Sequence, residues 1–123
     1  MKFDKLSNKV IGCAIEVHKN LGPGLLETTY EQCLAYELQI NGIEFKLQYP
    51  FPVVYKDIKL DCGYRADILI EHELILEIKS VERLIGIHEA QLLTYMKLSN
   101  ISKGLLINFN VRVLREGIKR YVL

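Results

Sequence analysis

The chain has 123 residues, half of them hydrophobic and a quarter charged, a composition that excludes a disordered or fibrous protein. Sixteen lysines and arginines against fifteen aspartates and glutamates give a formal net charge of +1, which counts against a strong non-specific DNA binder. There is no signal-peptide pattern, and no apolar run approaches the roughly 20 residues of a membrane span, so we expect no membrane association. The length fits one domain over residues 1–123.

The cysteine content argues against covalent or zinc cross-links. The three cysteines are odd in number and form no C-x-x-C pair, so neither a disulfide framework nor a zinc knuckle is predicted. Cys13 and Cys33 fall within helical patterns, where a free cysteine usually behaves as a small buried hydrophobe. We therefore expect a reducing, cytoplasmic environment.

Two helices are predicted in the first third of the chain. The run Leu21-Gly22-Pro23-Gly24 should end the first helix, because proline and glycine do not continue it. A second helical pattern follows from Leu26 to Leu38 and ends at Asn41-Gly42. The apolar residues of the first helix recur at steps of three and four, at Phe3, Leu6, Val10, Ala14 and Val17.

Strands dominate the rest of the predicted structure. Pro50 and Pro52 indicate a bent strand or a sheet edge, and Lys56-Asp57 and Glu71-His72 are typical of tight turns. One more helix is predicted from Ile87 to Leu98. This mixture predicts a single α/β (α+β) domain. The predicted strands cover residues 43–47, 53–55, 58–60, 64–70, 73–80, 104–109 and 118–123.

The residues with catalytic potential lie between positions 64 and 80. Glu77 and Lys79 are two apart in a strand and therefore face the same way, and an antiparallel neighbour would bring Asp67 beside Glu77. Two carboxylates bind a hard cation such as Mg²⁺ or Mn²⁺, which activates water and neutralises phosphate charge. A lysine beside them orients or deprotonates that water, or stabilises the charged phosphorus centre.

The same residues also have a purely structural interpretation. Asp67 would then end a strand, and Glu77 with Lys79 would form an ordinary pair on a solvated sheet. The apolar flanks of Glu77 and Lys79 argue against it, because charges inside an apolar strand need partners.

Two helical patterns accompany the strand pair. His88, Gln91 and Tyr95 share a helix face, which either lines the same cleft or faces solvent. Glu27 lies in the first turn of the second helix, where the macrodipole alone favours an acidic residue by roughly 0.3–1 kcal/mol. His18 near the end of the first helix has a similar electrostatic explanation.

Together these residues resemble the PD-(D/E)XK nuclease superfamily, and more narrowly the small bacterial family of GxxExxY proteins. Ala66 departs from the superfamily pattern, which has proline at that position. The matching elements are the namesake motif Gly24-Leu25-Leu26-Glu27-Thr28-Thr29-Tyr30, the metal-site stretch Arg65-Ala66-Asp67, the E-x-K element Glu77-Ile78-Lys79, and the Q-x-x-x-Y pattern Gln91-Leu92-Leu93-Thr94-Tyr95.

The resemblance implies a restriction-endonuclease-like core, with a central mixed sheet flanked by helices. It implies that Asp67, Glu77 and the main-chain carbonyl of Ile78 hold Mg²⁺ or Mn²⁺, with Glu27 as an additional acidic group, and that Lys79 activates water. The residues expected to position phosphate or nucleotide are Gln91, Tyr95, Tyr30, Arg65 and His18.

The predicted function is metal-dependent hydrolysis of phosphodiester bonds in nucleic acid, with DNA as the expected substrate. The alternative is a nuclease fold with weak or lost catalysis that binds nucleic acid or a protein partner. A third hypothesis is a hydrolase of another phosphorylated substrate. A homodimer through the edge strand near Pro50 is left open by the sequence.

Overall fold

The computed structural model describes residues 4–123, so Phe3 of the first predicted helix lies outside the described part. This part contains three α-helices, one 3-10 helix and seven strands, which confirms the predicted fold class. The elements are α1 (Lys5–Leu21), α2 (Glu27–Ile40), β1 (Phe45–Pro50), β2 (Val53–Tyr55), β3 (Ile58–Leu60), β4 (Arg65–Ile70), β5 (Leu74–Lys79), α3 (Gly86–Ser99), β6 (Lys103–Asn108), η1 (Leu114–Gly117) and β7 (Ile118–Val122).

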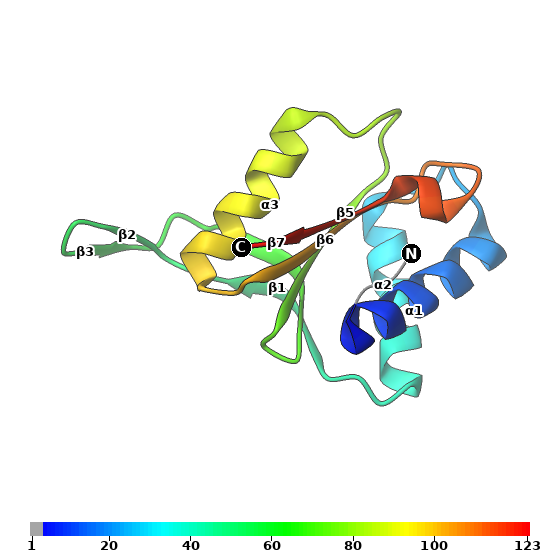
Figure 1. Cartoon of the computed structure of the whole chain (residues 1–123), viewed down its shortest axis with the longest axis horizontal. Coiled ribbons are helices and arrows are strands. Elements are labelled where there is room, and N and C mark those ends of the chain that lie inside the picture. Colours follow the sequence, from blue (N-terminus) through cyan, green and yellow to red (C-terminus); the bar gives the residue numbers. More distant parts are fainter. Residues whose placement is uncertain (1–3) are drawn as a thin grey trace.

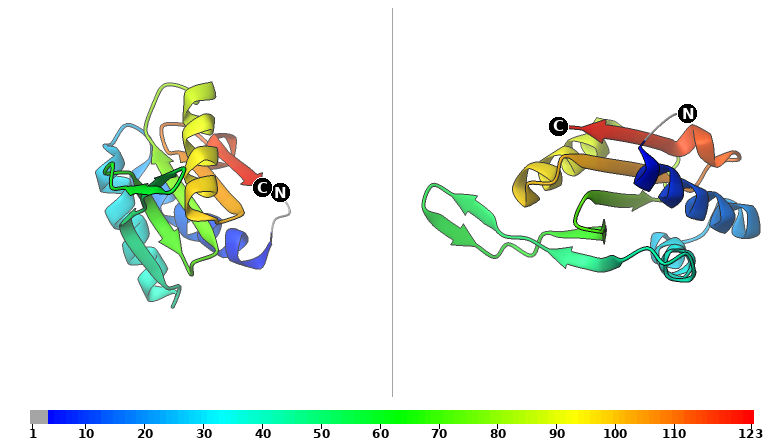
Figure 2. Two further views of the ribbon diagram at one scale, coloured as in Figure 1. Left: turned by 90° about the vertical axis from the view of Figure 1, so that its left-hand side faces the viewer. Right: turned by 60° about the horizontal axis from the view of Figure 1, so that its bottom comes forward.

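Five of the strands in residues 4–123 form one mixed sheet in the order β1-β4-β5-β6-β7 (Figure 1). In this sheet β5 and β6 run parallel and are connected through α3, whereas the other neighbours are antiparallel. β1 lies at the edge, as Pro50 predicted. β2 and β3 pair only with each other in the described part and form an arm that extends from the body (Figure 2).

Helices cover both faces of the sheet (Figure 1). Leu74, Leu76 and Ile78 of β5 belong to the core that includes α1 and α2, whereas Ile75 packs against the residues of α3. This alternation follows from the two-residue period of a strand. The sheet therefore separates two apolar cores, and the functional residues of β5 lie on the α3 side.

The helix boundaries follow the predicted signals. α1 ends at Leu21, where the main-chain N–H of Gly22 donates to the carbonyl of His18 at 2.8 Å. α2 begins at Glu27, which is thus in its first turn as expected. No sequence signal had been assigned to residues 110–117, which contain η1. No helix within residues 4–123 is long and apolar enough to cross a membrane.

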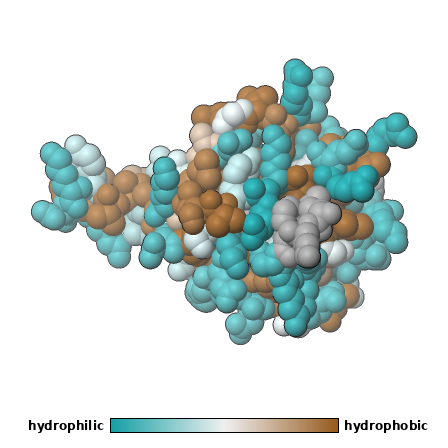
Figure 3. All heavy atoms as spheres, in the orientation of Figure 1, coloured by the Kyte–Doolittle hydropathy of each residue, from teal (hydrophilic) through white to brown (hydrophobic). Residues whose placement is uncertain are grey.

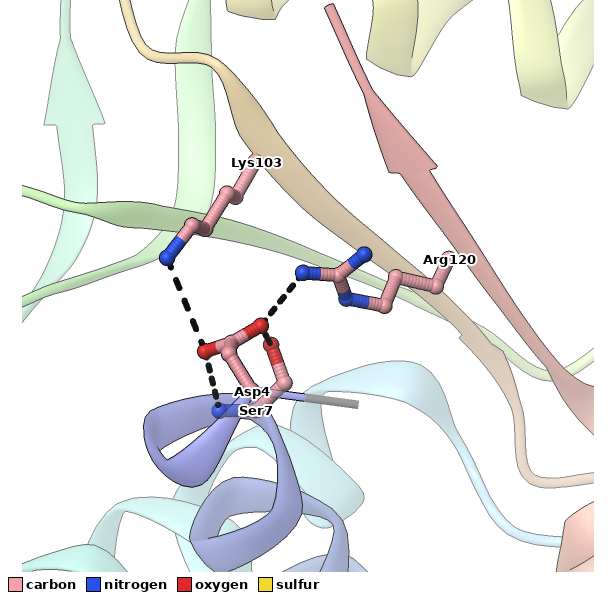
Figure 4. A network of polar contacts seen from close by, with 4 residues as sticks. All are labelled: Asp4, Ser7, Lys103 and Arg120. Atoms are coloured by element: carbon pink, nitrogen blue, oxygen red, sulfur yellow. Dashed lines mark hydrogen bonds and ion pairs between the residues drawn. The ribbon is translucent and has the colours of Figure 1, made fainter. Parts of the chain in front are cut away.

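Asp4 ties the start of α1 to the sheet (Figure 4). Its carboxylate accepts hydrogen bonds from the main-chain N–H of Ser7 at 3.1 Å and from the Ser7 hydroxyl at 2.8 Å. It also accepts one from Arg120 of β7 and lies 3.7 Å from the ammonium of Lys103 in β6. Burial raises the pKa of Asp4, but these hydrogen bonds and charges outweigh it and hold the pKa well below its usual range.

We predict that Asp4→Ala lowers the free energy of unfolding by about 1–2 kcal/mol, because the helix loses its N-cap and Arg120 loses its hydrogen bond to the Asp4 carboxylate. Asp4→Asn, which keeps an oxygen for Ser7 but no charge for Arg120, should fall between Asp4→Ala and wild type. Urea unfolding at pH 7 measures both effects. The carboxylate stabilises above its unfolded pKa, so the wild-type advantage should shrink as the pH falls below about 4. Equal stability at pH 7 would contradict the assignment.

Candidate active site

The centre of the site lies where β4 and β5 stop pairing. Their register ends with Ile68 opposite Leu76, and the next residues bond through side chains instead. The main-chain N–H of Asp67 donates to Glu77 Oε2 at 2.7 Å, and the main-chain N–H of Ile78 donates to Asp67 Oδ2 at 2.8 Å. The antiparallel pairing thus brings the two carboxylates together, as the sequence predicted.

α3 contributes a polar pair to the same site. Lys79 Nζ donates to Gln91 Oε1 at 3.3 Å, and Gln91 Nε2 donates to the Tyr95 hydroxyl at 2.9 Å. Tyr95 is buried, so this part of the helix face is turned to the strand rather than to solvent. His88 instead lies at the helix start, where its Nδ1 accepts from the main-chain N–H of Ile85 at 3.1 Å.

α2 adds two further carboxylates at successive turns. Glu27 Oε2 accepts from the main-chain N–H of Ser80, just beyond β5, at 3.1 Å. Glu31 Oε1 accepts from Gln48 Nε2 at 2.7 Å, and the same nitrogen lies 3.4 Å from Asp67 Oδ1. The acidic group therefore comprises residues from a helix and two strands.

These carboxyl groups perturb one another. Burial, together with the charge of Asp67, raises the pKa of Glu77 to about 8, although the Asp67 N–H and Lys79 act in the opposite direction. Burial also raises the pKa of Asp67, and burial with the charge of Asp67 raises the pKa of Glu31. At neutral pH the metal-free site consequently retains a proton on its most buried carboxyl group.

The donor chemistry fits a hard divalent cation. Within residues 4–123 no group of three or more histidine, cysteine, aspartate or glutamate side chains is arranged to hold a metal ion in this conformation. Asp67, Glu77 and Glu27 each accept a main-chain N–H here. The donors are nevertheless all oxygens, which Mg²⁺ and Mn²⁺ prefer, and a divalent cation would favour the ionised form of the carboxyl groups whose pKa is raised here.

The sequence profile of the PD-(D/E)XK nuclease superfamily matches residues 4–121, nearly the whole chain. The chain belongs to this superfamily. Searches among curated proteins and among solved structures found no significant match. The mixed five-stranded sheet with helices on both faces is consistent with the restriction-endonuclease-like fold of the superfamily. The narrower resemblance to GxxExxY proteins stays a prediction.

Tyr30, expected to contact substrate, has a different place in this PD-(D/E)XK chain. Its side chain is fully buried, and its ring stacks on Phe109 with centroids 4.4 Å apart. Its hydroxyl donates to the carbonyl of Gly22 and accepts from the main-chain N–H of Leu25. Tyr30 therefore holds the loop before Glu27 in this structure, and its contact with substrate stays a prediction.

His18 and Arg65, the two other substrate candidates, also lie apart from the carboxylates. The buried His18 donates from Nε2 to the carbonyl of Val111 at 2.7 Å, so it links α1 to the segment after β6 and has a structural place. Arg65 is exposed at the start of β4, opposite Pro50 and two residues before Asp67. Arg65 therefore remains a prediction for contacting substrate.

Two residues that the sequence did not single out belong to the acidic group. Glu31 lies four residues after Glu27 on α2, and this helical spacing is the signal that would have found it. Gln48 had no such signal. It lies in β1, and its own backbone, with a φ of +49°, is left-handed where its side chain contacts Glu31 and Asp67. A left-handed residue inside a strand is not visible in an alternation pattern.

Asn108 is a third unforeseen residue, and it fixes the chain just beyond Lys79. Its amide donates to the carbonyl of Val81 at 2.9 Å and accepts from the main-chain N–H of Val81 at 3.1 Å. Gly117 lets the chain pass close to the main chain of Asn108, since a Cβ there would lie 2.2 Å from the Asn108 carbonyl oxygen. A polar residue in an otherwise apolar strand was the available signal.

The raised pKa of Glu77 predicts a pH-dependent stability of the metal-free protein. The fold holds a proton that the unfolded chain releases near pH 4.5, so this contribution is complete below that pH and is lost as the pH rises toward about 8. The loss should be on the order of a few kcal/mol. Glu77→Gln, which cannot ionise, should flatten the decline, as measured by urea unfolding in chelator at several pH values.

The control is Glu73→Gln, which removes an exposed carboxylate at the turn before β5. It should leave the slope of stability against pH as in wild type. An unchanged slope in Glu77→Gln would contradict the proton-holding role of Glu77.

Proposed function

We propose that this chain is a metal-dependent nuclease that hydrolyses phosphodiester bonds of nucleic acid, DNA in the first instance. The observation that carries the proposal is the convergence of Asp67, Glu77 and Lys79 at the point where β4 and β5 separate. Membership of the nuclease superfamily supports the same reaction class. The compartment in which the chain acts is proposed to be the cytoplasm, on its cysteine usage alone.

Asp67, Glu77 and the main-chain carbonyl of Ile78 would hold Mg²⁺ or Mn²⁺, with Glu27 acting from the start of α2. The bound ion would supply a water of lowered pKa and offset negative charge on a phosphate oxygen. Each of these three carboxylates accepts a main-chain N–H on one oxygen, which leaves acceptor lone pairs that could bind the ion. Glu31 adds negative charge to the same site through Gln48.

Lys79 and its partners on α3 are proposed to act on the substrate side. The Lys79 ammonium donates hydrogen bonds to water or to a phosphate oxygen as negative charge develops there. Gln91 accepts from Lys79 and donates to Tyr95, so it orients the ammonium. Asn108 fixes the chain that follows Lys79. Arg65, exposed two residues before Asp67, would contact a neighbouring phosphate.

We predict that Asp67→Asn, Glu77→Gln and Lys79→Met each lower Mg²⁺- or Mn²⁺-dependent cleavage by about 100-fold or more, because each removes charge placed at the reacting phosphate. Cleavage of single-stranded DNA, duplex DNA and RNA measures the effect, with circular dichroism to show that each variant is folded. Lys9→Met, on the exposed side of α1, is the matched control and should retain activity. Metal-dependent cleavage surviving in all three site variants would sink the assignment.

The second candidate is a nuclease fold that binds nucleic acid or a protein partner without turnover. It is motivated by the structural use of three carboxylates of the site, each of which accepts a main-chain N–H. The near-neutral net charge fits it equally well. The same assays decide between the two, because salt-dependent binding of nucleic acid with no cleavage in either metal would favour this candidate.

A further inference from the structure

An uncharged groove continues the proposed active site along α3. It has a volume of about 400 Å³ and lies between this helix and the base of the β2–β3 arm. Gln91 and Tyr95 belong both to this groove and to the polar pair at Lys79. The residues that line it are Val53, Tyr64, Ile87, Ala90, Gln91, Thr94, Tyr95 and Leu98.

Tyr64 presents an aromatic surface in this groove. Tyr64 is 44 % exposed, whereas Phe51 and Tyr95 are buried. The Tyr64 and Phe51 rings lie nearly parallel, with centroids 6.5 Å apart, and the Tyr95 centroid lies 6.1 Å from that of Tyr64. Phe51 and Tyr95 meet edge to face at 4.9 Å. The exposed ring therefore rests on a packed aromatic cluster.

The lining selects the chemistry of a ligand. None of the lining residues carries a charged side chain, so the groove offers no counter-charge to a phosphate or to a charged peptide. A flat, neutral ring fits it, because a nucleobase stacks on an aromatic side chain for about 1–3 kcal/mol. Gln91 and Thr94 supply hydrogen-bonding groups for the edge of such a ring.

The contact between the groove and the Lys79 site indicates that the bound ring is a nucleobase of the substrate. A phosphodiester placed at Lys79 carries its nucleoside on one side or the other, and Gln91 directly connects the Lys79 ammonium to the groove. In a duplex the faces of a base are covered by its stacked neighbours, so they are not free to stack on Tyr64. The arm beside the groove exposes the apolar Val54 and Ile58 but also Lys56 and Lys59 (Figure 3), so the preference for an unpaired base rests on the groove and not on the arm.

We infer that this groove binds an unpaired nucleobase, stacked on Tyr64, next to the phosphodiester at the Asp67–Glu77–Lys79 site. The inference rests on the proposed function and specifies its substrate as single-stranded nucleic acid or an unpaired nucleotide. A second copy of the chain, inserting an apolar arm residue into the groove, is the competing occupant, and the experiment below distinguishes the two.

The test is a fluorescence titration in the cleavage-impaired Lys79→Met background with Mg²⁺ present. The sequence contains no tryptophan, so Tyr64→Trp introduces a single reporter into the groove. A short oligothymidylate should quench it and bind at least 10-fold more tightly than a duplex or an oligonucleotide of the same length with abasic residues. By anisotropy, Tyr64→Ala should weaken binding by about 5- to 100-fold, whereas Tyr64→Phe and the exposed Tyr36→Ala should not change it.

Equal binding of base-bearing and abasic strands, or unchanged binding in Tyr64→Ala, would overturn the inference. Quenching that follows protein concentration without nucleic acid, together with a dimer in sedimentation, would assign the groove to a second copy instead. The fluorescence measurement needs no cleavage of the substrate, so the nuclease function and the base-binding groove can each fail without the other. Absent cleavage with base-dependent quenching would remove only the nuclease function, and cleavage without base dependence would remove only the groove.

Discussion

The arrangement of the site depends on the burial of two carboxylates at the point where β4 and β5 part. Asp67 and Glu77 each accept a main-chain N–H from the opposite strand. Their side chains thus hydrogen-bond the two strands just beyond the last backbone-paired residues, Ile68 and Leu76. Burial raises the pKa of both groups, and the charge of Asp67 raises that of Glu77 further. A bound divalent cation would favour the ionised form of both carboxyl groups, and the raised pKa values predict that the stability of the fold depends on pH.

The rest of the fold positions groups around this pair. The sheet places α3 on one face and α1 with α2 on the other, so Gln91 approaches Lys79 from one side and Glu27 approaches Ser80 from the other (Figure 1). Tyr30 fixes the loop before α2, and Asn108 fixes the chain after β5. Tyr30, which belongs to a motif, thus supports the fold around the site. Asn108, which belongs to none, helps to position the chain that follows Lys79.

The parts of the site carried by regular periodicity could be predicted from the sequence. The two-residue period of β5 placed Glu77 and Lys79 on one face, and the helical period of α3 joined Gln91 to Tyr95. The parts that depend on local irregularity could not be predicted. Gln48, for example, contacts the carboxylates from a backbone conformation that is left-handed within a strand. The sequence also cannot separate a buried from an exposed motif residue: Tyr30 of the GxxExxY pattern, expected at the substrate, is fully buried.

The most direct test of the central claim is calorimetric titration of Mn²⁺ into chelator-treated protein at pH 7, in two buffers of different ionisation enthalpy. Because the pKa of Glu77 is about 8 in the metal-free fold, binding should release about one proton per ion. That release should disappear in Glu77→Gln, and binding itself should weaken in Asp67→Asn. Binding that releases no proton, or that neither substitution affects, would contradict the account.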